Sequence, residues 1–355
     1  MVVRFPLDFA LEFCIIMREG RDLMIHDLGF RFGKPARLNA LAALLILAAA
    51  CVASPQEQNP ADQPTTTLRV STDVVNVLAV VKDKKGRLIP SLTKDDFELS
   101  EDGTPQQIKY FSRETDTPLT LGILVDTSGS EQTMLPVLQR EANAFVRQVI
   151  RPKDLAFVMH FDLEVELLQD FTSDPARLER AINETRINTG GGGVLPGTFP
   201  GVSPGGTHFY DAVYLAAHDM LRNEIGRKVI IVLTDGVDQG SKEDLDTALE
   251  YAQKSDVVIY SIMVQDPGFD QGFSGGGSVL NKLSKRTGGE VIRARRDKDL
   301  AVAFQQIAKE LRTQYLLGYT PTNTSHDGAF RKIDVKLREG KYKVQARRGY
   351  YAPAG

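Results

Sequence analysis

In the middle of the chain, residues 117–312, uninterrupted apolar runs alternate with segments whose apolar residues recur at helical spacing. The runs LTLGILV, KVIIVLTDG and VVIYSIMV have the composition of buried strands. The segments between them predict amphipathic helices, for example over residues 135–149. Strands that alternate with helices predict an α/β domain with a doubly wound, Rossmann-like, mostly parallel sheet of six strands, covered by helices on both faces.

One strand of this sheet is expected to run against the others. DLAFVMHF and EVELLQDF both have strand patterns, and only a few residues separate them. A crossover connection needs a dozen residues or more, so these two strands must be antiparallel.

The flanking segments, residues 68–116 and 313–355, have β-type patterns instead. Asp102-Gly103 lies between two strand-like runs and predicts a hairpin, and Lys84-Lys85-Gly86 predicts a turn followed by a second strand. Neither segment has enough apolar residues to bury a core alone. We therefore expect the two segments to pack together as one small β-sandwich, with the α/β domain of residues 117–312 inserted between them.

The first 51 residues have the pattern of an export signal. A basic region precedes the apolar run 41–50, which is too short to cross a bilayer but fits a secretory signal. A start at Met24 would give a more conventional basic region. Cys51 follows three alanines, which leaves two alternatives open: a lipid anchor at Cys51, or cleavage and free secretion. The mature protein is thus expected outside the cytoplasm, secreted, periplasmic or lipid-anchored to the cell envelope, with residues 52–67 as a flexible linker.

Composition excludes several classes of function. The formal net charge is −3, and no basic block with interleaved aromatic residues is present, so nucleic-acid binding is not indicated. The two cysteines, Cys14 and Cys51, both lie in the predicted export signal. The body of the protein can therefore form neither a disulfide framework nor a thiolate metal site.

Carboxylates and hydroxyls follow the predicted buried strands, at the points where these strands end. Asp126 ends one strand, with Ser128 and Ser130 in the turn that follows, and Asp235 ends another. If these strands are neighbours where strand order reverses, the two aspartates face each other across the ligand-binding edge of the sheet. Thr207 closes a glycine-rich loop and adds a third hydroxyl. Such an all-oxygen set suits Mg²⁺, with Mn²⁺ or Ca²⁺ as alternatives.

These residues resemble the metal-ion-dependent adhesion site of von Willebrand factor type A domains. DTSGS is similar to the family's D-x-S-x-S motif, GGTHFYDAV to its second loop and LTDGVD to its third loop, in the family's order. The resemblance covers roughly residues 119–311. LSKRTGGE, QYLLGYTP and RRGYYAP also resemble the VWFA-related proteins of Acidobacteria and similar secreted bacterial proteins.

The resemblance implies a binding function. Ser128, Ser130 and Thr207 would bind the cation directly, while Asp126 and Asp235 would act mainly through water. An Asp or Glu carboxylate from a protein partner would fill the remaining position, so that the cation joins two proteins in an adhesion-type contact. The chain would then be a secreted or envelope-anchored binding protein rather than an enzyme, reaching a membrane only through a lipid anchor.

Other interpretations of the same residues remain open. Each of the five is also common in turns and helix caps. The protein could be a structural envelope protein whose cation only stiffens the fold. A hydrolase is a weaker alternative, since neither Ser128 nor Ser130 stands in a G-x-S-x-G motif and the chain has no H-E-x-x-H motif. Ser128 also stands where a haloacid dehalogenase needs its second aspartate.

Two glycine-rich loops and three polar residues complete the predicted surroundings of the site. The loop of residues 188–207 is expected to cover one side and influence specificity, unless it is an insertion without a role. The value of the second loop, residues 266–278, stays open. His208 is expected at the rim, Asp211 is expected to support the loop or the helix start, and Asp238 is expected to be solvated.

Overall fold

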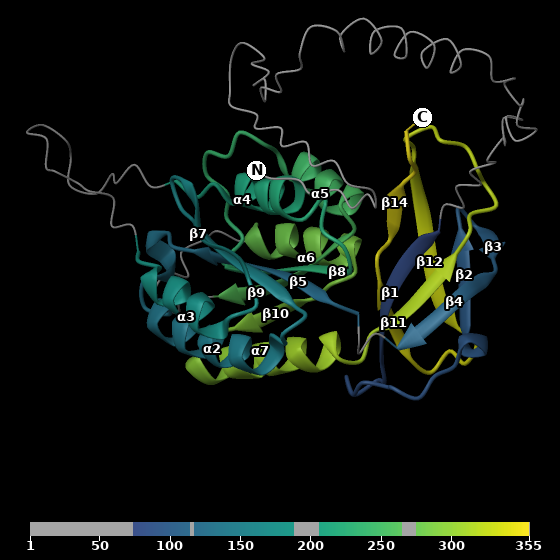
Figure 1. Cartoon of the computed structure of the whole chain (residues 1–355), viewed down its shortest axis with the longest axis horizontal. Coiled ribbons are helices and arrows are strands. Elements are labelled where there is room, and N and C mark those ends of the chain that lie inside the picture. Colours follow the sequence, from purple (N-terminus) through teal and green to yellow (C-terminus); the bar gives the residue numbers. More distant parts are fainter. Residues whose placement is uncertain (1–73, 114–116, 188–205, 265–274, 355) are drawn as a thin grey trace, which may run out of the picture. The chain divides into compact units, whose positions relative to one another are not determined.

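The computed structural model describes residues 74–113, 117–187, 206–264 and 275–354 (Figure 1). The chain divides into two units, Met1–Arg69 and Val70–Gly355, and every described residue belongs to the second. The predicted export signal and its two cysteines lie outside the described residues, so these expectations stay predictions. No helix in the described ranges is both long enough and apolar enough to cross a membrane.

The α/β domain is built on a six-stranded sheet with the strand order β10-β9-β8-β5-β6-β7. Its strands are β5 (Leu119–Asp126), β6 (Leu155–Phe161), β7 (Val165–Thr172), β8 (Arg227–Thr234), β9 (Val257–Val264) and β10 (Val291–Ala294). All neighbouring strands are parallel except β6 and β7, which are antiparallel. The predicted fold class is confirmed, including the single reversed strand.

Helices cover both faces of the sheet, as predicted (Figure 1). One face packs against α2 (Leu135–Val149), α3 (Pro175–Glu184) and α7 (Asp297–Leu311). The other face packs against α4 (Phe209–Leu215), its π-helical continuation η3 (Ala216–Met220), α5 (Leu245–Lys254) and α6 (Gly276–Thr287). Side chains alternate between the faces, so Ile123 of β5 joins one apolar cluster and Leu124 joins the other.

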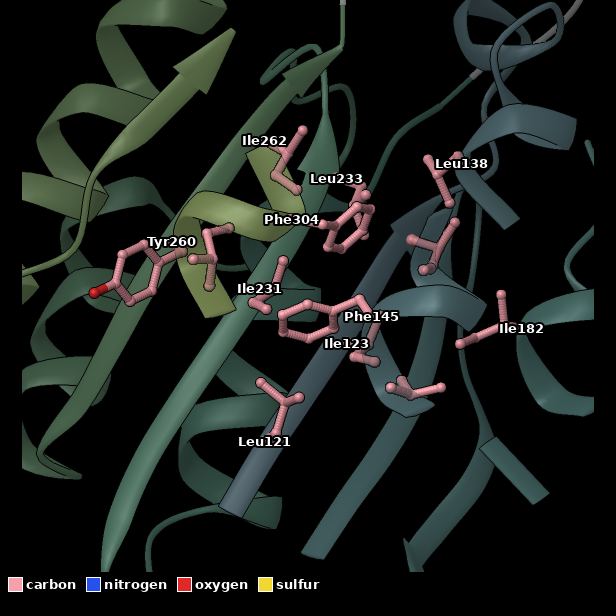
Figure 2. Close-up of a cluster of buried hydrophobic side chains, with 14 of the residues drawn as sticks. Leu121, Ile123, Leu138, Phe145, Ile182, Ile231, Leu233, Tyr260, Ile262 and Phe304 are labelled. Carbon is pink, nitrogen blue, oxygen red and sulfur yellow. The ribbon is translucent and has the colours of Figure 1, made fainter. Parts of the chain in front are cut away.

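Figure 2 shows the cluster that lies between the sheet and helices α2 and α7. Ile123 of β5 and Ile231 of β8 are fully buried, and they are direct partners in the register of the two strands. Phe145 of α2 and Phe304 of α7 pack together, with their ring centroids 5.1 Å apart. Each such side chain contributes about 1.5–3 kcal/mol by leaving water. This burial holds β5 and β8 side by side and so positions the strand ends that carry the candidate site.

The remaining strands form two four-stranded antiparallel sheets, β13-β1-β11-β4 and β14-β12-β2-β3. The strands before the α/β domain are β1 (Val75–Lys82), β2 (Phe97–Glu101), β3 (Thr104–Gln106) and β4 (Ile108–Arg113), with a short 3-10 helix, η1 (Lys94–Asp96), before β2. Those after it are β11 (Tyr315–Tyr319), β12 (Phe330–Leu337), β13 (Lys343–Ala346) and β14 (Gly349–Tyr351). Each sheet combines strands from the segment before the α/β domain with strands from the segment after it. The buried apolar side chains of these strands form one cluster.

The two turn predictions for the first segment have different outcomes. Asp102 and Gly103 have φ values of 47° and 82°, which a tight hairpin turn requires, and they join β2 to β3. The prediction of a strand after Gly86 is wrong, because this stretch has no strand and only one isolated β-bridge, between Leu88 and Lys82. Pro90 follows two residues later and has no N–H to continue a ladder.

Candidate metal centre

The turn after β5 brings Asp126, Ser128 and Ser130 together. Asp126 is fully buried, and its Oδ1 accepts a hydrogen bond of 2.9 Å from the backbone N–H of Ser128. The hydroxyl oxygens of Ser128 and Ser130 lie 3.0 Å apart. Octahedral Mg²⁺ holds oxygen ligands at about 2.1 Å, which places adjacent ligands about 3 Å from each other. The two hydroxyls thus have the spacing of adjacent ligands to one cation.

Helix capping does not account for the three hydroxyl residues. Ser128 precedes the 3-10 helix η2 (Gly129–Glu131), but its side chain makes no capping hydrogen bond. Met134 is the residue before α2, and His208 rather than Thr207 is the residue before α4. The capping alternative raised by the sequence is therefore not what these side chains do in the fold.

The third loop meets the first because β8 lies next to β5. Thr234, the last residue of β8, donates a buried hydrogen bond of 2.6 Å from Oγ1 to Oδ2 of Asp126. Asp235 follows, and its Oδ1 accepts a bond of 2.9 Å from the N–H of Val237. One carboxylate is thus held at the end of β5 and the other directly after β8, its parallel neighbour, at the place where the strand order reverses.

The second loop is held against the other two by separate contacts. Thr207, which is 8% exposed, pairs with Gln239 of the third loop through two backbone hydrogen bonds of 3.0 and 2.9 Å. The next residue, His208, donates its N–H to the carbonyl of Asp162 at 2.7 Å. Asp162 in turn accepts a bond of 2.8 Å at Oδ2 from the hydroxyl of Thr127, inside the first loop. Hydrogen bonds therefore connect each of the three loops to the other two, with Asp162 joining the first loop to the second.

The electrostatics of the centre favour a positive ion. Burial raises the pKa of Asp126 from its usual 3.8 to about 7, hydrogen bonds from Ser128 and Thr234 oppose this, and the charge of Asp235 adds to it. A divalent cation between the loops would offset the cost of burying this charge. No group of three or more His, Cys, Asp or Glu side chains able to hold a metal occurs in the described residues, so binding here would depend on the hydroxyl oxygens. With that condition, the donor set fits a hard divalent cation.

The sequence reasoning missed residues that position the site. The hydroxyl of Thr234 donates a hydrogen bond to the carboxylate of Asp126. The hydroxyl of Thr127 donates one to the carboxylate of Asp162, in the hairpin between β6 and β7. A threonine at the buried end of an apolar strand is a signal that could have identified Thr234, since such a hydroxyl needs a partner. Nothing in the sequence pairs Thr127 with Asp162, which follows β6.

The predictions for neighbouring polar residues are partly corrected. Asp238 is not simply solvated, because its Oδ1 accepts bonds from the N–H of Tyr210 at 3.1 Å and from the hydroxyl of Ser241 at 2.5 Å. The unpaired N–H groups in the first turn of α4 attract this carboxylate. Asp211 accepts from the backbone of Lys242 and Glu243 and so supports the loop before α5. Residues 188–205 and 265–274 of the glycine-rich loops lie outside the described residues.

Comparison with known proteins gives one family match. Residues 121–239 match the family model of the von Willebrand factor type A domain. No curated protein matches the chain. The similar solved structures include the conserved hypothetical protein BatB from Bacteroides thetaiotaomicron, which is 16% identical, with 54% of this chain and 98% of that chain covered and a TM-score of 0.42.

Two further solved structures are similar at comparable levels. The vWF domain of the type V pili tip protein Mfa5 from Porphyromonas gingivalis is 14% identical, covers 54% of this chain and 94% of its own, and has a TM-score of 0.42. A von Willebrand factor type A protein from Catenulispora acidiphila is 12% identical, covers 73% of this chain and 74% of its own, and has a TM-score of 0.44. The resemblance to the Acidobacterial proteins stays a prediction.

Proposed function

We propose, on the premise that this chain contains a von Willebrand factor type A domain, that it binds a protein partner through a divalent cation. Ser128, Ser130 and Thr207 would hold the ion directly, with Asp126 and Asp235 behind them. The ion would be Mg²⁺, or Mn²⁺ or Ca²⁺ in its place. When bound, it supplies an open position for an Asp or Glu carboxylate of the partner.

The observation that carries this proposal is that two neighbouring hydroxyls lie in the turn that directly follows a buried acid. The Ser128 and Ser130 hydroxyls share a hydrogen bond of 3.0 Å, and bonds from Ser128 and Thr234 fix the Asp126 carboxylate. Neutral hydroxyls in direct contact leave the ion strongly electrophilic, so that it attracts an anionic oxygen from outside. The chain's own residues orient the ligands, and the partner completes the coordination.

The same proposal includes that the protein is exported and that it binds a partner without catalysing a reaction. The pattern of residues 1–51 favours export, with a lipid anchor at Cys51 or free secretion as its two forms. The protein would then present its centre to partners in the cell envelope or outside the cell. We assign it no reaction, because the residues of the centre have roles in binding an ion and none in activating a nucleophile.

Substitution at the centre tests the proposal. Ser130→Ala removes one direct ligand, and Asp126→Asn removes the buried charge. Each is expected to weaken Mn²⁺ binding, measured by calorimetry on the full chain, by roughly 10- to 100-fold. Asp170→Asn, an exposed position on β7, is the matched control and should bind Mn²⁺ like the wild type. Unchanged Mn²⁺ affinity in both site variants would refute the proposed centre.

The same variants distinguish binding from a structural role. If the cation joins two proteins, Ser130→Ala should lose Mg²⁺-dependent capture of an envelope partner, while its free energy of unfolding in cation-free buffer should match that of the cation-free wild type. EDTA should release the partner from the wild type. If the cation only stiffens the fold, the free energy of unfolding should fall in Ser130→Ala and in EDTA-treated wild type, with no cation-dependent capture in either.

Cation affinity is expected to fall with acidity in a particular window. The cation needs the ionised form of Asp126, and the pKa of this carboxyl in the cation-free protein is about 7. Mn²⁺ affinity should therefore fall by about tenfold per pH unit below pH 7 and level off above it. Because this folded pKa lies above the unfolded value, the cation-free protein should also gain stability from this group as the pH falls from 7 toward 4. Calorimetry between pH 8 and pH 5.5 measures the Mn²⁺ affinity, and chemical denaturation between pH 8 and pH 4 measures the stability. The residual Mn²⁺ affinity of Asp126→Asn should not change with pH in this way.

A further inference from the structure

The hairpin between β6 and β7 places an exposed apolar side chain beside the candidate centre. Leu163, at the turn of the hairpin, is 36% exposed, although the residue before it, Asp162, is only 6% exposed. A Cβ added to Gly206 would lie 2.7 Å from Cδ2 of Leu163, so this methyl group rests directly on the Gly206 backbone. Gly206 precedes Thr207, and consecutive Cα atoms are about 3.8 Å apart. Leu163 therefore lies within about two residue spacings of a proposed cation ligand.

Several hydrogen bonds fix the position of this leucine. The carbonyl of Asp162 accepts from His208 at 2.7 Å, and its Oδ2 accepts from Thr127 at 2.8 Å. Its own N–H donates to the carbonyl of Glu164 across the turn at 3.0 Å. The turn is thus tied to the first and second loops of the centre. A partner would meet a preorganised apolar group, and little binding energy would be lost in ordering it.

A second exposed leucine lies farther along the same hairpin. Leu167 is 45% exposed, and it lies on the same sheet face as Val165, because their partners in β6 are Met159 and Phe161. Glu166 alternates onto the opposite face, where its Oε2 lies 3.1 Å from Nε2 of His160. A single exposed leucine is ordinary on a protein surface. What distinguishes Leu163 is its fixed position next to the loops that would bind the ion.

We propose that Leu163 is the apolar docking point for the bound partner, an inference that depends on the proposed function. The partner segment carries one Asp or Glu for the cation and, one or two positions to either side of it, an apolar side chain that packs on Leu163. The recognised feature is therefore a carboxylate with an adjacent apolar side chain, and not a carboxylate alone.

A random-peptide library displayed on phage provides the probe. Peptides are selected on the immobilised full chain with Mn²⁺ and eluted with EDTA. The wild type should enrich Asp or Glu followed or preceded by an apolar residue. Leu163→Ser should still enrich the acid but lose the apolar preference, and should bind a peptide selected on the wild type about tenfold more weakly. Its Mn²⁺ affinity should be unchanged, which shows that the centre itself is intact.

The controls separate this inference from the proposed function. Val302→Ser, at a 59% exposed apolar position on α7, should behave like the wild type. EDTA-sensitive enrichment of acids with no apolar neighbour, or equal peptide affinity for the wild type and Leu163→Ser, overturns the role of Leu163 and leaves the cation site standing. No EDTA-sensitive enrichment overturns both. A change of oligomeric state in Leu163→Ser would assign the leucine to self-association and overturn the docking role.

Discussion

Replacing Lys82 by methionine is expected to lower the free energy of unfolding by about 3–5 kcal/mol, because it leaves a buried carboxylate without its cation. Lys82 is the last residue of β1, and its Nζ lies 2.6 Å from Oε1 of Glu310, whose side chain is fully buried near the end of α7. The same ammonium contacts the carboxylate of Glu290, just before β10. This ion group connects a strand of the sandwich to the α/β domain.

The loss should depend on pH in a way that identifies its cause. Burial raises the pKa of Glu310, and the charge of Lys82 opposes that rise. Without Lys82, the pKa of Glu310 is expected to be higher still. A carboxyl with a folded pKa above its unfolded pKa binds its proton more tightly when folded, so its contribution to stability falls as the pH rises through that range. The destabilisation of Lys82→Met should therefore be largest at neutral pH and smaller near pH 5.

Two further variants control the experiment, which is read by chemical denaturation of the full chain. Arg87→Met breaks the pair with Asp83, in which the arginine side chain is 76% exposed, and should lower the free energy of unfolding far less than Lys82→Met does. The double variant Lys82→Met with Glu310→Gln removes both charges and should recover most of the loss. Equal losses in Lys82→Met and Arg87→Met, or no recovery in the double variant, would contradict the assignment.

Much of the α/β domain can be predicted from sequence because its signals are local. Each buried strand is one continuous apolar run, each helix has its own periodicity, and the short hairpin fixes β7 as antiparallel. The error after Gly86 has a local and a long-range cause. Along one part of its length β1 pairs with β11, and along another part with β13, both from beyond the α/β domain. Leu88 forms only a single bridge to β1, and Pro90 is the one local signal against a strand there.

In the candidate centre, too, the local contacts could be predicted from the sequence and the long-range contacts could not. Asp126, Ser128 and Ser130 lie in one turn, so their proximity follows from the sequence itself. The contact from Thr234 to Asp126 depends on β8 lying beside β5, which the sequence offered only as a condition. The contacts of Asp162 depend on where β6 ends relative to two other loops. The arrangement of these residues is now known, while their role as cation ligands stays a prediction for the binding measurements above.

The start of α6 is expected to be as important for the centre as any of its proposed ligands. A Cβ added to Gly276, the first residue of α6, would lie 2.2 Å from the carbonyl oxygen of Asp235 and 2.9 Å from the carbonyl carbon of Gly236. Gly236 in turn has a φ of +83°, and a Cβ there would lie 2.7 Å from the carbonyl oxygen of Gly276. Two backbone segments thus touch where any side chain would separate them.

Replacing Gly276 by alanine should therefore displace Asp235, since backbone atoms cannot move away by changing rotamer. We expect Mn²⁺ affinity to fall by at least about tenfold and the free energy of unfolding to fall by about 2–3 kcal/mol. Gly275→Ala is the matched control, because a Cβ at Gly275 meets no atom within 4 Å. If Gly276→Ala and Gly275→Ala bind Mn²⁺ equally, then Asp235 either tolerates displacement or takes no part in the centre. If Ser130→Ala also binds Mn²⁺ with the affinity of the wild type, then Asp235 takes no part in the centre. That result would count against all five proposed ligands.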